Sequence, residues 1–211
     1  MIKGWWNKMF KSAIKSEFQV TGITSGVMEE AIQNWILIYK GEPNWINPEN
    51  GIKTIKMAKF VCEEIARLSN LAIDVEFDGA RKEYMKQFWE KSVKGFLREW
   101  TGIAVACGTM ILKPNGEGVD FITPDKFEIT SLDGNHNITG IVFQDNYQEG
   151  EYYYTKFEYH RFFSARIRMD VEKEYEDKTF YAVSNRAYVS KNAGELGKAT
   201  DLSNTRWAGL E

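Results

Sequence analysis

The residues best suited to acid–base or metal chemistry are few in this sequence and stand apart. The chain of 211 residues has two histidines, His136 and His160, and two cysteines, Cys62 and Cys107. Neither histidine has a cysteine or a carboxylate at the spacing typical of metal ligands, so we predict no metal site. Both cysteines lie among apolar residues, which favours reduced thiols in a core over a disulfide bond.

Motifs for nucleotide binding and for nucleophilic catalysis are equally sparse. The G-E-G sequence at 116–118 lacks the G-x-x-x-x-G-K-[ST] pattern and opens no helix, so it predicts a turn. No serine lies in a G-x-S-x-G motif. We therefore predict no cofactor and no enzymatic activity. An enzyme whose site assembles from scattered residues is the weakest of the interpretations that remain.

Charge and composition narrow the class of protein further. Aromatic residues make up 14% of the chain, which favours a large buried sheet or an interaction surface. The 27 basic residues are outnumbered by 30 acidic ones, and this balance argues against a dedicated nucleic-acid-binding protein. No apolar run is long enough to cross a membrane, and the N-terminus does not resemble a secretory signal.

Residues 1–20 form a basic, aromatic segment with helical periodicity. Such a helix can pack on its own domain or a sister subunit, dock on a separate partner, or lie on a membrane surface. The first two alternatives are favoured, and we expect no membrane association. The candidate interface residues are the aromatic and basic side chains of this segment: Trp5, Trp6, Phe10, Lys8, Lys11 and Lys15.

Three further helices are predicted, over about 25–41, 51–70 and 80–101. In the second, the small residues Ala58, Cys62 and Ala66 would allow close approach of a partner helix. Three aromatic residues near the first helix are interpreted as core and not as a ligand platform: Trp35, Tyr39 and Trp45.

Alternating patterns predict strands after these helices. The segment 71–79 alternates apolar and acidic residues, and strands are predicted from 103 onward. Asp133-Gly134-Asn135 predicts a hairpin between 127–132 and 138–145, and the mixed charges of 170–177 predict an exposed hairpin. Helices followed by an antiparallel meander indicate an α+β fold. We expect one domain over 25–190 and a tail over 191–211.

The order and spacing of several segments between residues 28 and 210 resemble the N-terminal part of portal proteins from tailed bacteriophages. These segments are W-I-L-I-Y-K-G-E-P-N-W at 35–45, A-K-F-V-C-E-E-I-A-R-L-S-N-L at 58–71, G-T-M-I-L-K-P at 108–114, V-D-F-I-T-P-D-K-F at 119–127, I-T-G-I-V-F at 138–143, Y-Y-Y-T-K-F-E-Y-H at 152–160, Y-A-V-S-N-R-A-Y-V-S at 181–190 and L-G-K-A-T-D-L at 196–202.

The resemblance implies a structural subunit of a ring, usually of twelve copies, at one capsid vertex. Double-stranded DNA passes through such a ring during packaging and ejection, and a head–tail connection is built on it. Expected partners are the capsid or scaffolding protein, the terminase and head-completion proteins, and the expected location is the virion, with the host cytoplasm during assembly. The matched part corresponds to the wing, which lies outside the tunnel, so we expect no tight DNA binding. The sequence stops at Glu211, before the stem, clip and crown of the family.

The alternative interpretation is a soluble α+β module that binds a partner through its N-terminal amphipathic helix. It belongs to a different class, because it needs neither a ring nor a capsid.

Overall fold

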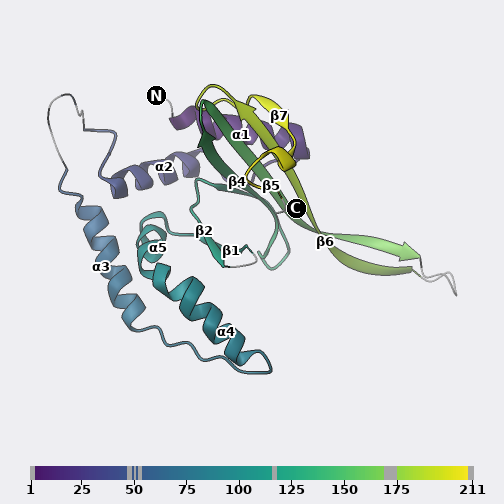
Figure 1. Cartoon of the computed structure of the whole chain (residues 1–211), viewed down its shortest axis with the longest axis horizontal. Coiled ribbons are helices and arrows are strands. Elements are labelled where there is room, and N and C mark those ends of the chain that lie inside the picture. Colours follow the sequence, from purple (N-terminus) through teal and green to yellow (C-terminus); the bar gives the residue numbers. More distant parts are fainter. Residues whose placement is uncertain are drawn as a thin grey trace. The chain divides into compact units, whose positions relative to one another are not determined.

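The computed structural model describes residues 3–46, 49, 51, 54–115, 118–168 and 175–208. It has the predicted α+β fold, in which helices precede antiparallel sheets (Figure 1). The chain divides into two compact units, one made of 1–25 with 126–211 and the other of 26–125. This division differs from the predicted single domain over 25–190, because the N-terminal helix belongs with the sheet while the other helices form a unit of their own.

The first unit contains a five-stranded antiparallel sheet in which each strand pairs with the next along the chain. The turn at 133–137 joins its first two strands, as the Asp133-Gly134-Asn135 sequence predicts. The strands are β3 (Phe127–Leu132), β4 (Ile138–Glu149), β5 (Tyr152–Arg168), β6 (Tyr175–Ser190) and β7 (Lys198–Thr200).

Helix α1 (Lys3–Phe18) packs against one face of this sheet. The ring of Phe10 stacks on Phe157 with 5.5 Å between centroids, and Ile14 is fully buried in the same cluster. Alternation along β5 presents Phe157 and Tyr159 to the helix and turns Glu158, which lies between them, to the other face. Burial of Phe10 and Ile14 stabilises the unit by about 1.5–3 kcal/mol each.

The linker after α1 is fixed along the edge strand β3. The amide of Ile23 donates to the carbonyl of Ile129 at 2.9 Å, and the amide of Thr24 donates to Glu128 Oε1 at 3.0 Å. A Cβ at Gly22 would lie 2.0 Å from the same carboxylate oxygen, so any larger residue there would displace the Glu128 side chain. These contacts tie the first 25 residues to the sheet.

The C-terminal segment also belongs to the first unit, which corrects the prediction of a tail over 191–211. Strand β7 pairs with β6, and Trp207 is buried with its indole nitrogen donating to Asp145 Oδ2 at 2.7 Å. The guanidinium of Arg206 lies 4.3 Å from the centre of the Tyr147 ring and 3.3 Å from the Asp145 carboxylate. Residues 209–211 lie outside the described residues.

The second unit is built from helices and one small hairpin. Ile32, Ile36 and Cys107 form its buried core, where α2 meets the end of α5. The hairpin joins this unit through Phe121, whose ring stacks on Trp100 with 5.5 Å between centroids. The elements are α2 (Gly26–Lys40), α3 (Met57–Leu71), α4 (Lys82–Phe88), a π-helical turn (Trp89–Val93), α5 (Lys94–Cys107), β1 (Ile111–Pro114) and β2 (Val119–Ile122).

The last helical stretch runs further than predicted. It was expected to end at 101 with a strand from 103, but α5 continues to Cys107 and the strand begins at Ile111. Gly102 is buried inside the helix, where an added Cβ would come within 3.2 Å of Tyr39 Oη and 3.5 Å of Glu63 Cγ. The glycine therefore serves close packing of α5 against α3, and Gly108, with φ of +75°, ends the helix.

The predicted start of α3 and the predicted strand over 71–79 are also wrong. Helix α3 begins at Met57 and not at 51, because Lys56 before it adopts a left-handed conformation with φ of 53° that an α-helix excludes. The segment 71–79 alternates in sequence but forms no strand within the described structure. Alternation alone did not make a strand there, because a strand also requires a neighbouring strand.

Candidate interaction surface

The predicted interface residues of α1 do not form an open surface. Phe10 is 5% exposed and contributes to the core of its own unit, so its assignment as an interface residue is wrong. The ammonium of Lys11 donates to the carbonyl of Thr24 at 2.6 Å, which holds the linker, while Lys15 is exposed. The side chains of Trp5, Trp6 and Lys8 lie outside the described residues.

A row of polar residues on β5 occupies the sheet face opposite α1. The Lys156 ammonium lies 2.9 Å from Glu158 Oε2, and His160 Nε2 lies 2.5 Å from Glu158 Oε1. The other ring nitrogen of His160 contacts the Tyr181 hydroxyl on β6. Partial desolvation of the hydroxyl and the Glu158 charge raise the pKa of Tyr181 above its ordinary value.

This row was not predicted, although the spacing of its residues in the sequence indicates it. Residues 156, 158 and 160 are spaced by two, which places their side chains on one face of a strand. The pairing satisfies a buried carboxylate with a buried ammonium and an imidazole, as buried charges require. The row is therefore sufficiently explained as part of the packing of the sheet.

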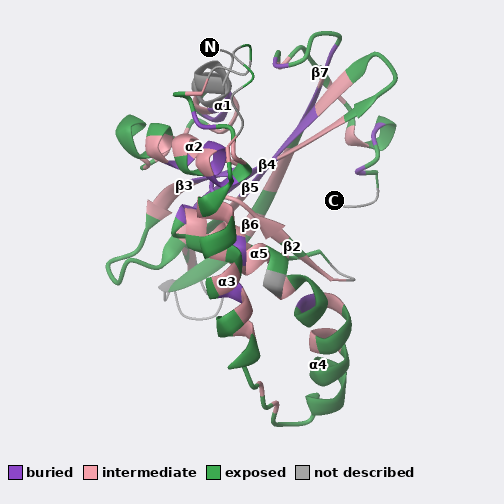
Figure 2. Cartoon of the chain, turned by 90° about the vertical axis from the view of Figure 1, so that its left-hand side faces the viewer, coloured by how far each residue is buried: buried purple, intermediate pink, exposed green. Residues whose placement is uncertain are grey.

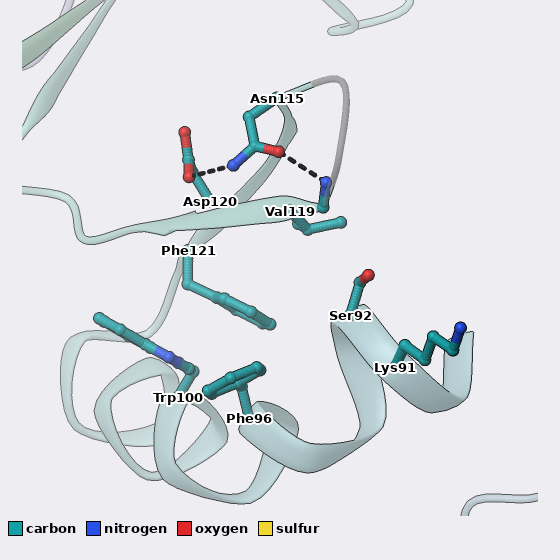
Figure 3. A pocket seen from close by; sticks show the side chains of 9 residues that line it. Lys91, Ser92, Phe96, Trp100, Asn115, Val119, Asp120 and Phe121 are labelled. Atoms are coloured by element: carbon teal, nitrogen blue, oxygen red, sulfur yellow. Dashed lines mark hydrogen bonds between the residues drawn. The ribbon is translucent and has the colours of Figure 1, made fainter. Parts of the chain in front are cut away.

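The second unit contains an open aromatic pocket of about 540 Å³ beside the π-helical turn. Figure 3 shows the rings of Phe96, Trp100 and Phe121 gathered on one side of it. Asn115 donates to Asp120 at 2.8 Å and accepts from the amide of Gly118 at 2.7 Å, so these polar groups serve the hairpin turn. The pocket thus offers apolar rings but no buried charge to orient a ligand.

The larger feature of this unit is the outward face of α3. Large apolar side chains recur there at intervals of three and four residues, while the small residues Ala58, Cys62 and Ala66 occupy another side. Phe60 is 65% exposed and Leu71 is 74% exposed. Figure 2 shows exposed residues along α3. We call this the α3 face, and its members are Met57, Phe60, Val61, Ile65, Leu68 and Leu71.

Two tryptophans expected in the core add to the apolar surface of the second unit. Trp45 is 74% exposed and Trp35 on α2 is also exposed, so both predictions were wrong, while Tyr39 is buried as expected. Helix α2 buries Ile36 and Leu37 as well as Ile32 and Tyr39, which leaves Trp35 off the contact side. An exposed apolar surface of this kind marks an interaction site in folded proteins.

The first unit has its own exposed apolar element. Strand β4 stops pairing with β5 at Arg161, yet β5 and β6 remain paired to Arg168 and Tyr175. We call residues 162–168 with 175–181 the arm, and Figure 1 shows it projecting beyond the other strands of the sheet. Phe162 packs on Tyr181 across one face and Phe163 on Phe180 across the other, and all four rings are exposed.

An arm of two strands has no core of its own, and two-stranded hairpins are only marginally stable in water. Its exposed aromatic pairs and open edges are the features by which strands recruit further strands. The stretch 170–177 is predicted as an exposed hairpin. Its residues 170–174 lie outside the described residues, and Asp177 is exposed.

The described residues form neither a metal cluster nor a helix that could span a membrane. No group of three or more histidine, cysteine, aspartate or glutamate side chains among them is arranged to hold a metal ion. None of the helices in the described ranges is both long enough and apolar enough to cross a membrane.

Comparison with known proteins found no matching family model, no matching curated protein and no matching solved structure.

Proposed function

We propose that this chain is a structural subunit of a phage portal ring at the capsid vertex. Double-stranded DNA is packaged and ejected through that ring, and the head–tail connection is built on it. The proposal places the protein in the virion, and in the host cytoplasm during assembly, with twelve copies as the expected ring. Its partners would be the capsid or scaffolding protein, the terminase and the head-completion proteins.

The observation that carries the proposal is the presence of two different exposed apolar surfaces on one chain. The α3 face belongs to the second unit and the arm belongs to the first, and neither repeats the other in sequence or in secondary structure. A ring of identical subunits needs such a pair, because each copy meets its two neighbours through unlike surfaces. The sequence segments that resemble portal proteins support the same class.

The alternative of a module that binds through its N-terminal helix loses its main support. The apolar side of α1, with Phe10, Ala13 and Ile14, is occupied by the sheet of its own unit. In the described part of α1, these apolar side chains face the sheet and not a separate partner. We therefore do not propose this alternative.

Negative-stain electron microscopy of the gene product that carries this chain tests the proposal directly. We expect closed rings, and we expect the pair of changes Phe60→Asp and Leu68→Asp to abolish them by placing charge on the α3 face. Ser69→Asp, an exposed polar position on the same helix, is the matched control and should leave rings intact. A monodisperse monomer at every concentration would contradict the proposal.

A further inference from the structure

The segment after α3 has the sequence of a strand without a strand partner. Residues 72–78 read A-I-D-V-E-F-D, with Ile73, Val75 and Phe77 alternating with acidic residues. Asp74, Glu76 and Ile73 are exposed, and the Phe77 ring lies 6.5 Å from Trp89, which anchors one end. We call this the acidic segment, and from Ile73 to Asp78 it takes part in no strand pairing within the described structure.

The arm has the matching open edge. Beyond Arg161, the outer side of β5 has no strand beside it within the described chain, so its backbone groups face solvent there. The open stretch 162–168 and the acidic segment each span seven residues. Edges of this kind bind extended peptides by strand addition, with backbone hydrogen bonds supplying affinity and side chains supplying specificity.

The charges of the two elements are opposite. The open stretch reads F-F-S-A-R-I-R over 162–168, with two arginines and no acidic residue, while the acidic segment has three carboxylates and no basic residue. Arg166 already lies 3.8 Å from Asp177 across the arm, but both side chains are more than 70% exposed. An exposed pair at that distance is weak and can exchange for a better one.

We propose that the arm of one copy takes up the acidic segment of a second copy as an additional strand beside β5. The choice of a second copy rests on the proposed ring, in which unlike surfaces of identical chains meet at every interface. The arm and the acidic segment lie in different units of the chain, so each subunit offers both halves of the contact. Charge complementarity then selects the pairing and disfavours contact between two arms.

Disulfide trapping between two differently tagged variants tests the contact. In both, Cys62→Ser and Cys107→Ala remove the native thiols; one then carries Ser164→Cys in the arm and the other Val75→Cys. We expect a cross-linked product that contains one chain of each kind. The control replaces Ser164→Cys by Ser203→Cys, an exposed position outside the arm, and should give no such product. Absence of a product at ring-forming concentrations would overturn the inference.

Charge reversal tests the pairing independently of its register. Asp74→Lys with Glu76→Lys on one partner, or Arg166→Glu on the other, should each reduce the cross-linked product by about tenfold or more. Combining both reversals should restore it. These positions are exposed, and circular dichroism of each variant checks that it is folded. A product that is insensitive to charge, or one that is not rescued, would contradict the inference.

Microscopy of the same samples separates this inference from the proposed function. Rings without the cross-link would show that the subunits assemble through other surfaces, which overturns the inference alone. A cross-link between chains without closed rings would support the pairing and refute the ring. A chain carrying both Ser164→Cys and Val75→Cys that forms its disulfide internally, and not with a second copy, would overturn the inference.

Discussion

At the scale of single residues, the predicted burial of aromatic side chains was wrong in both directions. Phe10 stands in a basic, aromatic segment but lies in the core of the first unit. Trp45 was expected in a core but stands 74% exposed. The sequence of an amphipathic helix shows that it has an apolar side, but not what covers that side.

Phe10→Ala should destabilise the first unit by about 3–5 kcal/mol, because it removes a stacked ring from a packed site. Lys15→Ala on the same helix is the control, since that side chain is exposed and its loss should change stability by no more than about 0.5 kcal/mol. Urea unfolding followed by circular dichroism measures both. Equal stability of the two variants would show that α1 is not part of the core.

The two thiols should differ in reactivity. Burial raises the pKa of Cys107 to about 11 from 9.0, so its thiolate is scarce at pH 8, while Cys62 is only partly buried. A disulfide reagent should therefore label the Cys107→Ala variant, which keeps Cys62, faster than the Cys62→Ala variant. The difference should vanish in denaturant. Faster labelling of Cys107 in the folded protein would refute this.

The same shift sets a pH dependence for stability. Because the folded pKa of Cys107 lies above its unfolded value, the neutral thiol is favoured in the native state. Its contribution is complete below the unfolded pKa near 9 and is lost as the pH rises toward 11. Cys107→Ala should flatten this alkaline part of the stability profile.

At the scale of elements, backbone constraints fix how the C-terminal segment closes the sheet. Gly197, which precedes β7, has φ of +72°, and an added Cβ would lie 2.1 Å from the carbonyl oxygen of Val189. That oxygen belongs to the backbone and cannot move aside easily. The register of β7 on β6 therefore depends on this glycine.

Gly197→Ala should destabilise the protein by about 1–3 kcal/mol and expose the β6–β7 pairing. Gly134→Ala is the matched control, because nothing lies within 4 Å of the added Cβ there. Thermal unfolding gives the global effect, and hydrogen exchange at Ala187 and Val189 gives the local one. Unchanged exchange at those amides would argue against the constraint.

The sequence predicts the elements of the first unit better than those of the second. In the sheet, alternation is reinforced by turn residues such as Asp133, and the hairpin at 127–145 is confirmed. In the second unit, I-A-V-A-C at 103–107 is apolar on every side, so periodicity could not separate a buried strand from a buried helix. Gly102 was predicted to end the helix, because the sequence does not distinguish a glycine that permits close packing from one that ends a helix.

The candidate surfaces were less predictable than the fold. The β5 row of Lys156, Glu158 and His160 follows from strand spacing alone. The arm and the α3 face do not follow from spacing. The arm depends on where β4 stops pairing with β5, and the α3 face depends on which sides of the helix its neighbours cover. Strand β4 is shorter than β5, and no residue pattern in β5 itself shows that its last seven residues pair with β6 but not with β4.

At the scale of the whole molecule, charge decides how the chain should behave toward DNA. The formal net charge is −3, and useful non-specific affinity requires roughly six or more basic contacts together. Among the basic residues expected to cluster on α1, Lys11 is occupied by the Thr24 carbonyl. The charge balance therefore predicts weak binding of duplex DNA.

We expect duplex DNA to bind with a dissociation constant weaker than about 100 μM at physiological salt. Fluorescence anisotropy with a labelled duplex at two salt concentrations measures it. Micromolar affinity with a steep salt dependence would reveal a folded basic surface and would favour a nucleic-acid-contacting role over the proposed wing.

The division of the chain also has a consequence for synthesis on the ribosome. The first unit is assembled from residues 1–25 and 126–211, so α1 emerges long before Val142, Phe157 and Tyr188, against which it packs. At ordinary translation rates, its apolar side waits on the order of ten seconds for those partners. Residues 26–125 emerge completely within that interval and can fold first. In a nascent chain, the second unit can therefore fold while the apolar side of α1 is still exposed. We expect a chaperone to bind the chain at this helix.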